Sequence, residues 1–329
     1  MVSAPEPSAP PGPSAPPEPS PAAEPSPPAE DDSVPAFWAG LGLPGLADIH
    51  VHFLPPRLRR KVWAYFDEAG PLIGRAWPIR YKWTDEQRAA HLRVMGVRMF
   101  SALAYAHRPA MAADLNDWTL EFARQTPGCI PSATFYPEPG VADYVGRALE
   151  AGAAIFKIHL QVGGFPPDDP ALDPVWGLLA EAGHPVVVHA GHAPVATAHT
   201  GPEPFAALLA RFPALTAVIA HMGAPDYENF LALAEQYDRV YLDTTMAFTG
   251  FFEEFAPFPV AARPRLRDLG LGGKILLGSD FPGIPYPYRE QLAGLERLDL
   301  GPDWLRAVCW HNPVTLMGGR FLAPAPGGP

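Results

Sequence analysis

The stretch Asp48-Ile49-His50-Val51-His52 is the part of the sequence from which the fold can be worked out. Alternate side chains of a β-strand point to the same side, so His50 and His52 share one face, while Ile49 and Val51 share the other. Two imidazoles on one rigid face are a ready pair of ligands for zinc or a similar divalent ion. Because two nearby histidines are often incidental, their meaning depends on what ends the other strands.

Short apolar or β-branched runs alternate along the chain with longer amphipathic segments rich in Ala and Leu. The runs predict eight strands, at 47–53, 98–103, 130–136, 154–160, 186–190, 217–221, 240–244 and 275–278. Helices are expected near 85–95, 113–126, 141–151, 173–183, 203–212, 227–237, 261–269, 288–298 and 303–318. Alternation of this kind implies parallel strands joined by crossover helices. We therefore predict an α/β fold, a (β/α)₈ barrel of the TIM type. A doubly wound open sheet is less favoured, since no glycine-rich phosphate loop follows any strand.

Polar side chains occur where several of these strands end, which is where barrels carry their chemistry. The fourth strand presents Lys157 and His159 on one face, the fifth ends at His189, and the sixth ends at His221. The eighth runs directly into Asp280. A histidine that caps a single buried strand is often only hydrogen-bonded, and a lone aspartate there could be a helix N-cap. Together with the first histidine pair, however, these residues indicate one shared metal or catalytic site.

A family resemblance follows from these residues. The set His50-x-His52, His189, His221 and Asp280 on eight βα units resembles the amidohydrolase superfamily of metal-dependent barrels. The phrases Lys157-Ile158-His159, His221-Met222-Gly223 and Gly278-Ser279-Asp280 look like its amidohydrolase-related branch. That branch includes decarboxylases similar to aminocarboxymuconate-semialdehyde decarboxylase, alongside many hydrolases. The resemblance covers roughly residues 45–320 and is poorly specific for substrate.

The resemblance implies a metal-dependent hydrolase with a defined ligand set. His50, His52, His189 and Asp280 would bind one divalent metal ion, with Zn²⁺ expected and Mn²⁺ or another ion acceptable. The metal would bring the pKa of a bound water toward about 7, and that water would attack an ester, lactone or amide carbonyl. His221 and Asp280 would carry the protons. The alternative is a non-oxidative decarboxylase of an aromatic or unsaturated acid, which needs the same ligands.

Several residues are candidates for substrate binding. Lys157 and His159 are expected to form a polar pair that faces the substrate, although some superfamily members use a lysine of this strand to bridge two metal ions. His192 lies just past the fifth strand. The long segment 54–84 carries seven basic residues, Arg75 among them, against two acidic ones, with three tryptophans interleaved. It could be a lid that binds a small, carboxylate-bearing substrate. It could equally be a solvated helix whose tryptophans lie in the core or in a subunit contact.

Composition excludes some classes of protein. A formal net charge of −11 argues against nucleic-acid binding, which needs a basic face. Two cysteines, Cys129 and Cys309, are too few for a disulfide framework, so a cytoplasmic location is expected. No run is long enough to span a membrane. The expected partner is a small-molecule substrate, and a homodimer is the default assembly.

Domain organisation follows from a change in composition near residue 34. Residues 1–34 are rich in Pro, Ala, Ser and Glu and are predicted to be a disordered tail, because they offer little apolar surface to bury. Residues 35–322 form the expected catalytic barrel, and residues 323–329 a flexible C-terminus.

Overall fold

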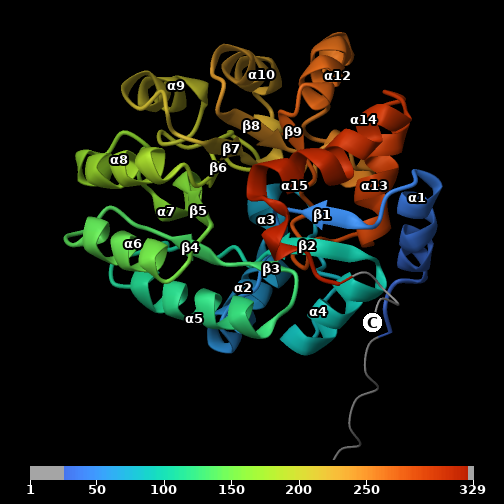
Figure 1. Cartoon of the computed structure of the whole chain (residues 1–329), viewed down its shortest axis with the longest axis horizontal. Helices are drawn as coiled ribbons and strands as arrows, with labels where there is room; N and C mark the ends of the chain where they lie inside the picture. The colour runs from blue at the N-terminus through green and yellow to red at the C-terminus, as the bar shows by residue number, and fades with distance from the viewer. Residues whose placement is uncertain (1–25, 325–329) are drawn as a thin grey trace, which may run out of the picture.

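The fold is a closed barrel of parallel strands, described for residues 26–324 in a computed structural model. Its strand segments are β1 (Leu46–Asp48), β2 (Val97–Ser101), β3 (Cys129–Ile130), β4 (Ser132–Thr134), β5 (Ile155–His159), β6 (Val186–His189), β7 (Ala217–Ile219), β8 (Val240–Asp243) and β9 (Ile275–Leu276). They pair in parallel in the orders β1-β2-β3 and β4 to β9. Only Pro131 separates β3 from β4, so the nine segments form eight barrel strands in the order of the sequence, around the centre of Figure 1.

Backbone hydrogen bonds join the last strand to the first. The N–H of Ile49 donates to the carbonyl of Leu277 at 3.0 Å, and the N–H of Asp280 donates to the carbonyl of His50 at 2.9 Å. These two bonds close the barrel between its last and first strands, where no regular strand pairing is present among the described residues. They involve the residues next to and within the candidate site. The predicted (β/α)₈ barrel is confirmed.

Helices surround the strands, and the expected ones are present within a few residues of their predicted bounds (Figure 1). They are α4 (Asp85–Val94), α5 (Ala112–Gln125), α6 (Val141–Glu150), α8 (Asp173–Ala182), α9 (Pro202–Arg211), α10 (Tyr227–Gln236), α12 (Arg263–Leu271), α13 (Tyr288–Arg297), α14 (Pro302–Arg306) and α15 (Asn312–Met317). Helix α6 shows why the helices could be predicted from the sequence. Its buried residues recur at helical spacing and form one apolar face toward the sheet: Val141, Tyr144, Val145 and Ala148.

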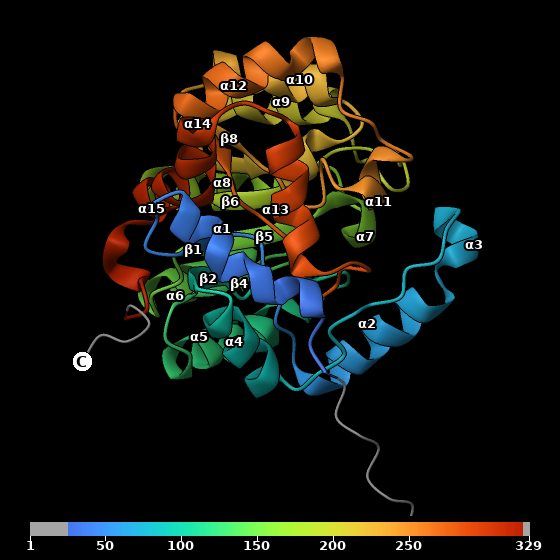
Figure 2. The same cartoon turned by 90° about the vertical axis from the view of Figure 1, so that its right-hand side faces the viewer.

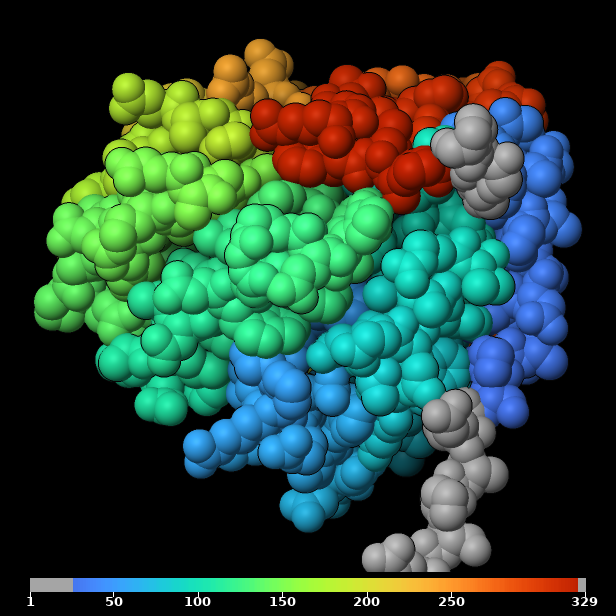
Figure 3. Space-filling model, turned by 60° about the horizontal axis from the view of Figure 1, so that its bottom comes forward, coloured from blue at the N-terminus to red at the C-terminus, as the bar shows by residue number. Residues whose placement is uncertain are grey.

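The segment 54–84 forms an arm beside the mouth of the barrel. It contains α2 (Pro56–Glu68) and α3 (Gly70–Ile73), which project from the body in Figure 2 and appear as the blue protrusion in Figure 3. The shorter helices α7 (Leu160–Gly163) and α11 (Gly250–Glu253), which follow β5 and β8, lie on the same side of the molecule (Figure 2). The loops that follow the strands therefore gather at one end of the barrel.

The N-terminal boundary predicted from composition is wrong at its inner edge. Residues 29–33 form a 3₁₀ turn that leads into α1 (Val34–Gly40), and Asp31 is buried. The Asp31 carboxylate accepts hydrogen bonds from Tyr81 Oη at 2.6 Å, from His91 Nε2 at 2.9 Å and from the backbone N–H of Arg289 at 3.0 Å. The last bond caps the first turn of α13 from a distant part of the chain. The rest of the predicted tail, residues 1–25, lies outside the described residues.

The C-terminal boundary also needs a correction. Ala323 was expected to begin a flexible end, but its N–H donates to the carbonyl of Arg98 at 2.8 Å, and the Arg98 guanidinium donates back to its carbonyl. Residues 325–329 lie outside the described range. Within residues 26–324, no helix is long and apolar enough to cross a membrane.

Candidate metal centre

His50 is a fully buried imidazole whose orientation is fixed by a carboxylate. It follows β1, and its Nδ1 lies 2.8 Å from Oδ2 of Asp243 at the end of β8. Burial alone would raise the pKa of Asp243, but its contact and hydrogen bond with His50 hold that pKa below its ordinary value. An ionised carboxylate only accepts hydrogen bonds, so Nδ1 of His50 carries the proton and Nε2 keeps its lone pair. A carboxylate behind an imidazole in this way is the usual support of a metal-bound histidine.

His50 is also held in its neutral form. Burial, together with the neighbouring Lys157, lowers its pKa to about 3. Lys157 lies on β5, and its Nζ is 3.1 Å from Nε2 of His50, while burial lowers the lysine pKa to about 8. The lysine therefore reaches the ligand group itself. His159, two residues further on the same strand, also lines the cavity, and its ring stacks on His189.

Asp280 brings the second strand-1 histidine into the group. Its Oδ1 lies 2.9 Å from Nε2 of His52 and 3.5 Å from Nε2 of His50. Nδ1 of His52 donates to the carbonyl of Leu103 at 2.8 Å. Although burial would raise the pKa of Asp280, its close contact with His52 holds that pKa below its ordinary value. A carboxylate that faces two imidazole nitrogens, whose other nitrogens are already engaged, fits a bound cation between them.

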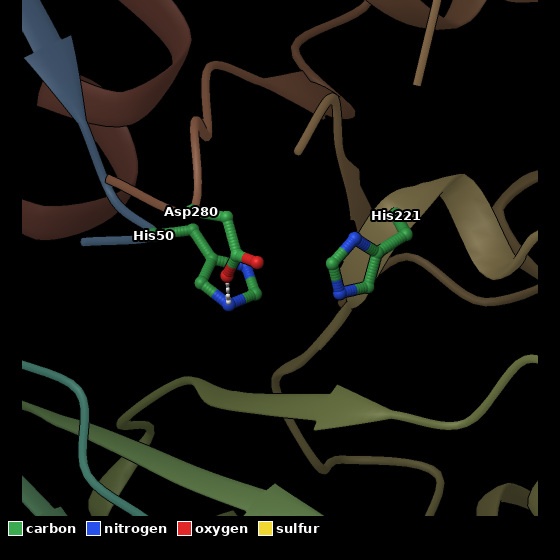
Figure 4. Close-up of side chains that lie close together, drawn as sticks. All are labelled: His50, His221 and Asp280. Carbon is green, nitrogen blue, oxygen red and sulfur yellow. Dashed lines mark ion pairs between the residues drawn. The ribbon is translucent and has the colours of Figure 1, made fainter. Parts of the chain in front are cut away.

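His221 faces the same point from the opposite wall (Figure 4). Its backbone N–H donates to Oδ1 of Asp243 at 3.0 Å, and its Nδ1 lies 3.1 Å from the carbonyl of Thr245. The carbonyl can only accept, so Nε2 is left with a lone pair. His50, His221 and Asp280 each offer an atom within 4.8 Å of the others, which makes them a group that could hold a metal ion.

His189 adds a free lone pair next to this group. Its Nε2 donates to the carbonyl of Ala193 at 2.8 Å, so Nδ1 is the unprotonated nitrogen. That Nδ1 is buried and has no hydrogen-bond partner within residues 26–324. The ring lies edge to face with His221, at 4.8 Å between centroids. An orphaned buried lone pair is the donor that a metal ion would satisfy, so the residues present fit such an ion.

Two predicted substrate residues lie elsewhere. His192 is paired with Asp226 at 2.7 Å, and Arg75 binds the carbonyl of Phe251 and the carboxylate of Glu254. Neither is among the described residues that line the cavity in front of the histidines, which has a volume of about 520 Å³. Arg75 instead connects the arm (residues 54–84) to helix α11 through these two contacts.

Asp243 was missed by the sequence analysis although its signal was present. It ends a predicted strand, as His189 and His221 do, but a carboxylate before two threonines looks like an ordinary strand end. Tyr105 was missed as well. It lines the cavity, and its ring lies 6.1 Å from that of His52 and 5.0 Å from that of His159.

Asp243→Asn is expected to weaken metal binding by about 10- to 100-fold, because the amide no longer fixes the tautomer and orientation of His50. The dissociation constant for Zn²⁺, measured by competition with a chromogenic chelator, tests this. Asp238→Asn, an exposed carboxylate just before β8, is the matched control and should leave the constant unchanged. Equal affinity in both variants would show that Asp243 does not support the metal.

Comparison with known proteins places this geometry in a family. The family model described as Amidohydrolase matches residues 47–318. None of the curated proteins matches the chain significantly in sequence. Among solved structures, an uncharacterised TIM-barrel protein from Bordetella bronchiseptica is 19% identical, with a TM-score of 0.66 over 84% of this chain and 100% of that one.

Two further solved structures carry a stated activity. A probable 2-pyrone-4,6-dicarboxylic acid hydrolase from Acinetobacter baumannii, with citric acid bound, is 15% identical, with a TM-score of 0.58 over 83% of this chain and 99% of that one. A 5-carboxyvanillate decarboxylase from Novosphingobium aromaticivorans, with bound manganese and a nitrobenzoic acid, is 14% identical, with a TM-score of 0.59 over 84% and 98%. At these identities the likenesses show the fold. The family match over most of the chain confirms the resemblance carried by its histidines and aspartate: the chain belongs to the amidohydrolase family.

Proposed function

We propose that the protein is a metal-dependent hydrolase that acts on an ester, lactone or amide carbonyl of a small, carboxylate-bearing substrate. The observation that carries the proposal is the convergence of His50, His221 and Asp280, each from a different strand end, on one point of the cavity wall. We further propose that His52 and His189 complete the ligand set for one divalent ion. Zinc suits these nitrogen and oxygen donors, and manganese is an acceptable substitute.

The protein's own groups supply orientation and proton transfer. A divalent ion held there supplies Lewis acidity and lowers the pKa of water. His221 has Nδ1 engaged by Thr245, so its Nε2 can take a proton from the attacking water and return it to the leaving group. Asp280, ionised and beside His52, can share that proton. Asp243 keeps both His50 and the backbone of His221 in place.

The charges on the cavity wall favour an anionic substrate. Arg59, Lys61, Arg88 and Lys157 line it, and Asp280 is the one acidic residue that lines it within residues 26–324. This balance is opposite to that of the chain, whose formal net charge is −11. Guanidinium and ammonium groups bind carboxylates through charge-assisted hydrogen bonds.

A non-oxidative decarboxylase is the second candidate, and the apolar lining favours it. Trp63, Phe66, Trp77 and Phe252 face the same cavity, so an aromatic acid could lie against them with its carboxylate at the ligand group. His221 would then protonate the ring carbon as the carboxyl group leaves.

Metal removal and isotope labelling test the proposal together. Protein stripped with a chelator should lose activity against a panel of lactones, esters and aromatic acids, and one equivalent of Zn²⁺ or Mn²⁺ should restore it. In ¹⁸O-labelled water, a hydrolase places the label in the product carboxylate. Release of unlabelled product and carbon dioxide would favour the decarboxylase, and activity that survives complete metal removal would contradict both. A second tightly bound equivalent of metal that Lys157→Ala abolishes would show a two-metal site.

The cysteines bear on cellular location. Both are buried free thiols, which is consistent with the cytoplasmic location that we propose.

A further inference from the structure

A groove on the outside of the barrel lies between α4 and α5, two neighbouring helices at the bottom of Figure 1. Its volume is about 390 Å³, and it shares no lining residue with the cavity in front of the histidines. Trp118 and Phe122 of α5 line it one helical turn apart, with their rings stacked at 5.4 Å between centroids. Both side chains are only partly buried. Ala89 of α4 also lines the groove with a small side chain, so an aromatic surface stays open to solvent.

Packing within the barrel accounts for only part of this aromatic surface. Phe122 stacks on Phe53 at 4.5 Å between centroids, which joins it to the core. Trp118 stacks on Phe122 in turn and is the last ring of the row. An indole at the end of such a row offers an apolar ring and an N–H donor to whatever covers the groove.

The charges in the groove are close to balanced. Asp85 and Glu121 are each paired with an arginine that lies outside the lining. The other two charged residues that line the groove within residues 26–324, Glu86 and Arg93, have opposite signs. A groove of this kind suits an uncharged segment better than a strongly charged one.

The proline-rich segment of this chain (residues 7–19) has a pattern that matches the groove. A proline occurs at every third position of this segment: Pro7, Pro10, Pro13, Pro16 and Pro19. Residues 7–17 carry no charged side chain. A polyproline II helix has three residues per turn, so in that conformation the five rings would lie along one edge. Aromatic-lined grooves are the sites that bind such proline-rich segments.

The chain enters the described structure close to the groove. Asp31 is held by His91 of α4, and α4 has 10 residues and is therefore only about 15 Å long. Pro19 precedes Asp31 by 12 residues, which would span roughly 37 Å as a polyproline II helix. A segment tethered at this range has an effective concentration of about 1 mM, so even a weak site would be largely occupied.

We propose that the groove between α4 and α5 binds the proline-rich segment of the same chain. The edge of prolines lies against Trp118 and Phe122, and the indole N–H of Trp118 donates to a carbonyl of the segment. The segment then covers the outer wall of the barrel and leaves the metal cavity open. This proposal is independent of the proposed function.

An exchange of residues within the proline-rich segment tests the fit and leaves residues 26–324 unchanged. The exchange variant carries Ala9→Pro with Pro10→Ala and Ala15→Pro with Pro16→Ala, which keeps the composition but spreads the prolines over all three edges. A fluorescein-labelled peptide of residues 7–19 should bind the full-length exchange variant. It should bind the full-length wild-type protein about tenfold more weakly, because the protein's own segment competes for the groove. Fluorescence anisotropy gives both dissociation constants.

A substitution in the groove provides the second arm. Trp118→Leu, made in the exchange variant, keeps an apolar side chain and removes the indole, so it should weaken peptide binding by about tenfold or more. Asp117→Asn, at an exposed neighbour outside the groove lining, is the matched control and should leave the dissociation constant unchanged. If Trp118→Leu does not fold, the comparison of wild type with the exchange variant still decides the question.

Three results would overturn the proposal. They are an exchange variant that does not bind the peptide, equal affinity in wild type and exchange variant, and undiminished binding in a folded Trp118→Leu protein. Sedimentation velocity identifies the occupant, since binding within one chain leaves wild type and exchange variant equally associated. Wild-type dimers that the exchange variant lacks would show that the groove takes the segment of a second copy, which contradicts the proposal.

Discussion

Asp280→Asn is expected to lower turnover by at least ~10³-fold and to reduce the metal content of the purified protein. The amide has no negative charge to offer a cation, and it could not take part in the proton transfer that we propose for His221. The loss should appear in the rate of product formation with any active substrate of the panel, and in metal content measured by atomic absorption.

A matched control separates the charge of Asp280 from its unusual backbone. Asp280 has a φ of +68°, and Asp299, an exposed residue just after the end of α13, has a φ of +53°. Asparagine tolerates this left-handed conformation about as well as aspartate does. Asp299→Asn should therefore leave both activity and metal content unchanged. Full metal content in Asp280→Asn would remove this residue from the ligand set.

His221→Ala is expected to lower turnover by about 10²- to 10⁴-fold while most of the metal stays bound. His50, His52, His189 and Asp280 would remain as ligands, whereas the proton carrier would be missing. Rate measurements across pH, with metal content determined on the same samples, distinguish the two effects. If His221 is the proton carrier that we propose, a variant that keeps its metal should also show an altered pH–rate profile.

The structure makes this a sharp test, because His221 lies close enough to His50 and Asp280 to be a ligand itself. Should His221→Ala lose its metal while His52→Ala retains it, the two histidines would have to exchange roles. His192→Ala is the control, since His192 is paired with Asp226 outside the cavity lining and should affect neither quantity.

The barrel could be predicted because strand and helix periodicities alternate regularly in the sequence. The first strand shows the limit of that pattern. Its regular pairing covers only Leu46–Asp48, yet His50 and His52 still share a face, with ring centroids 5.1 Å apart. Irregular bonds to the segment after β9 keep the chain extended there. The side chains therefore still alternate beyond the end of the regular strand pairing. A sequence pattern shows this alternation but does not show where the regular pairing ends.

The direction of loop side chains could not be predicted. Lys157 and His159 are held by a strand, which points both side chains into the cavity lining. His192 and Arg75 lie in connecting segments, which have no regular backbone geometry that would fix where a side chain points. Their positions depend on partners distant in sequence, Asp226 and Glu254, which nothing in the local pattern indicates.

Asp31 has a consequence for the way this chain can be shortened or varied. It joins the N-terminal turn to Tyr81 in the arm and to the start of α13, which follows the loop of Asp280. The ring of Tyr81 lies 4.6 Å from that of Phe281, the neighbour of Asp280. One buried carboxylate therefore links the N-terminal turn to the arm and to the segment around Asp280. A truncation that removes Asp31 is therefore expected to loosen the loop that carries Asp280.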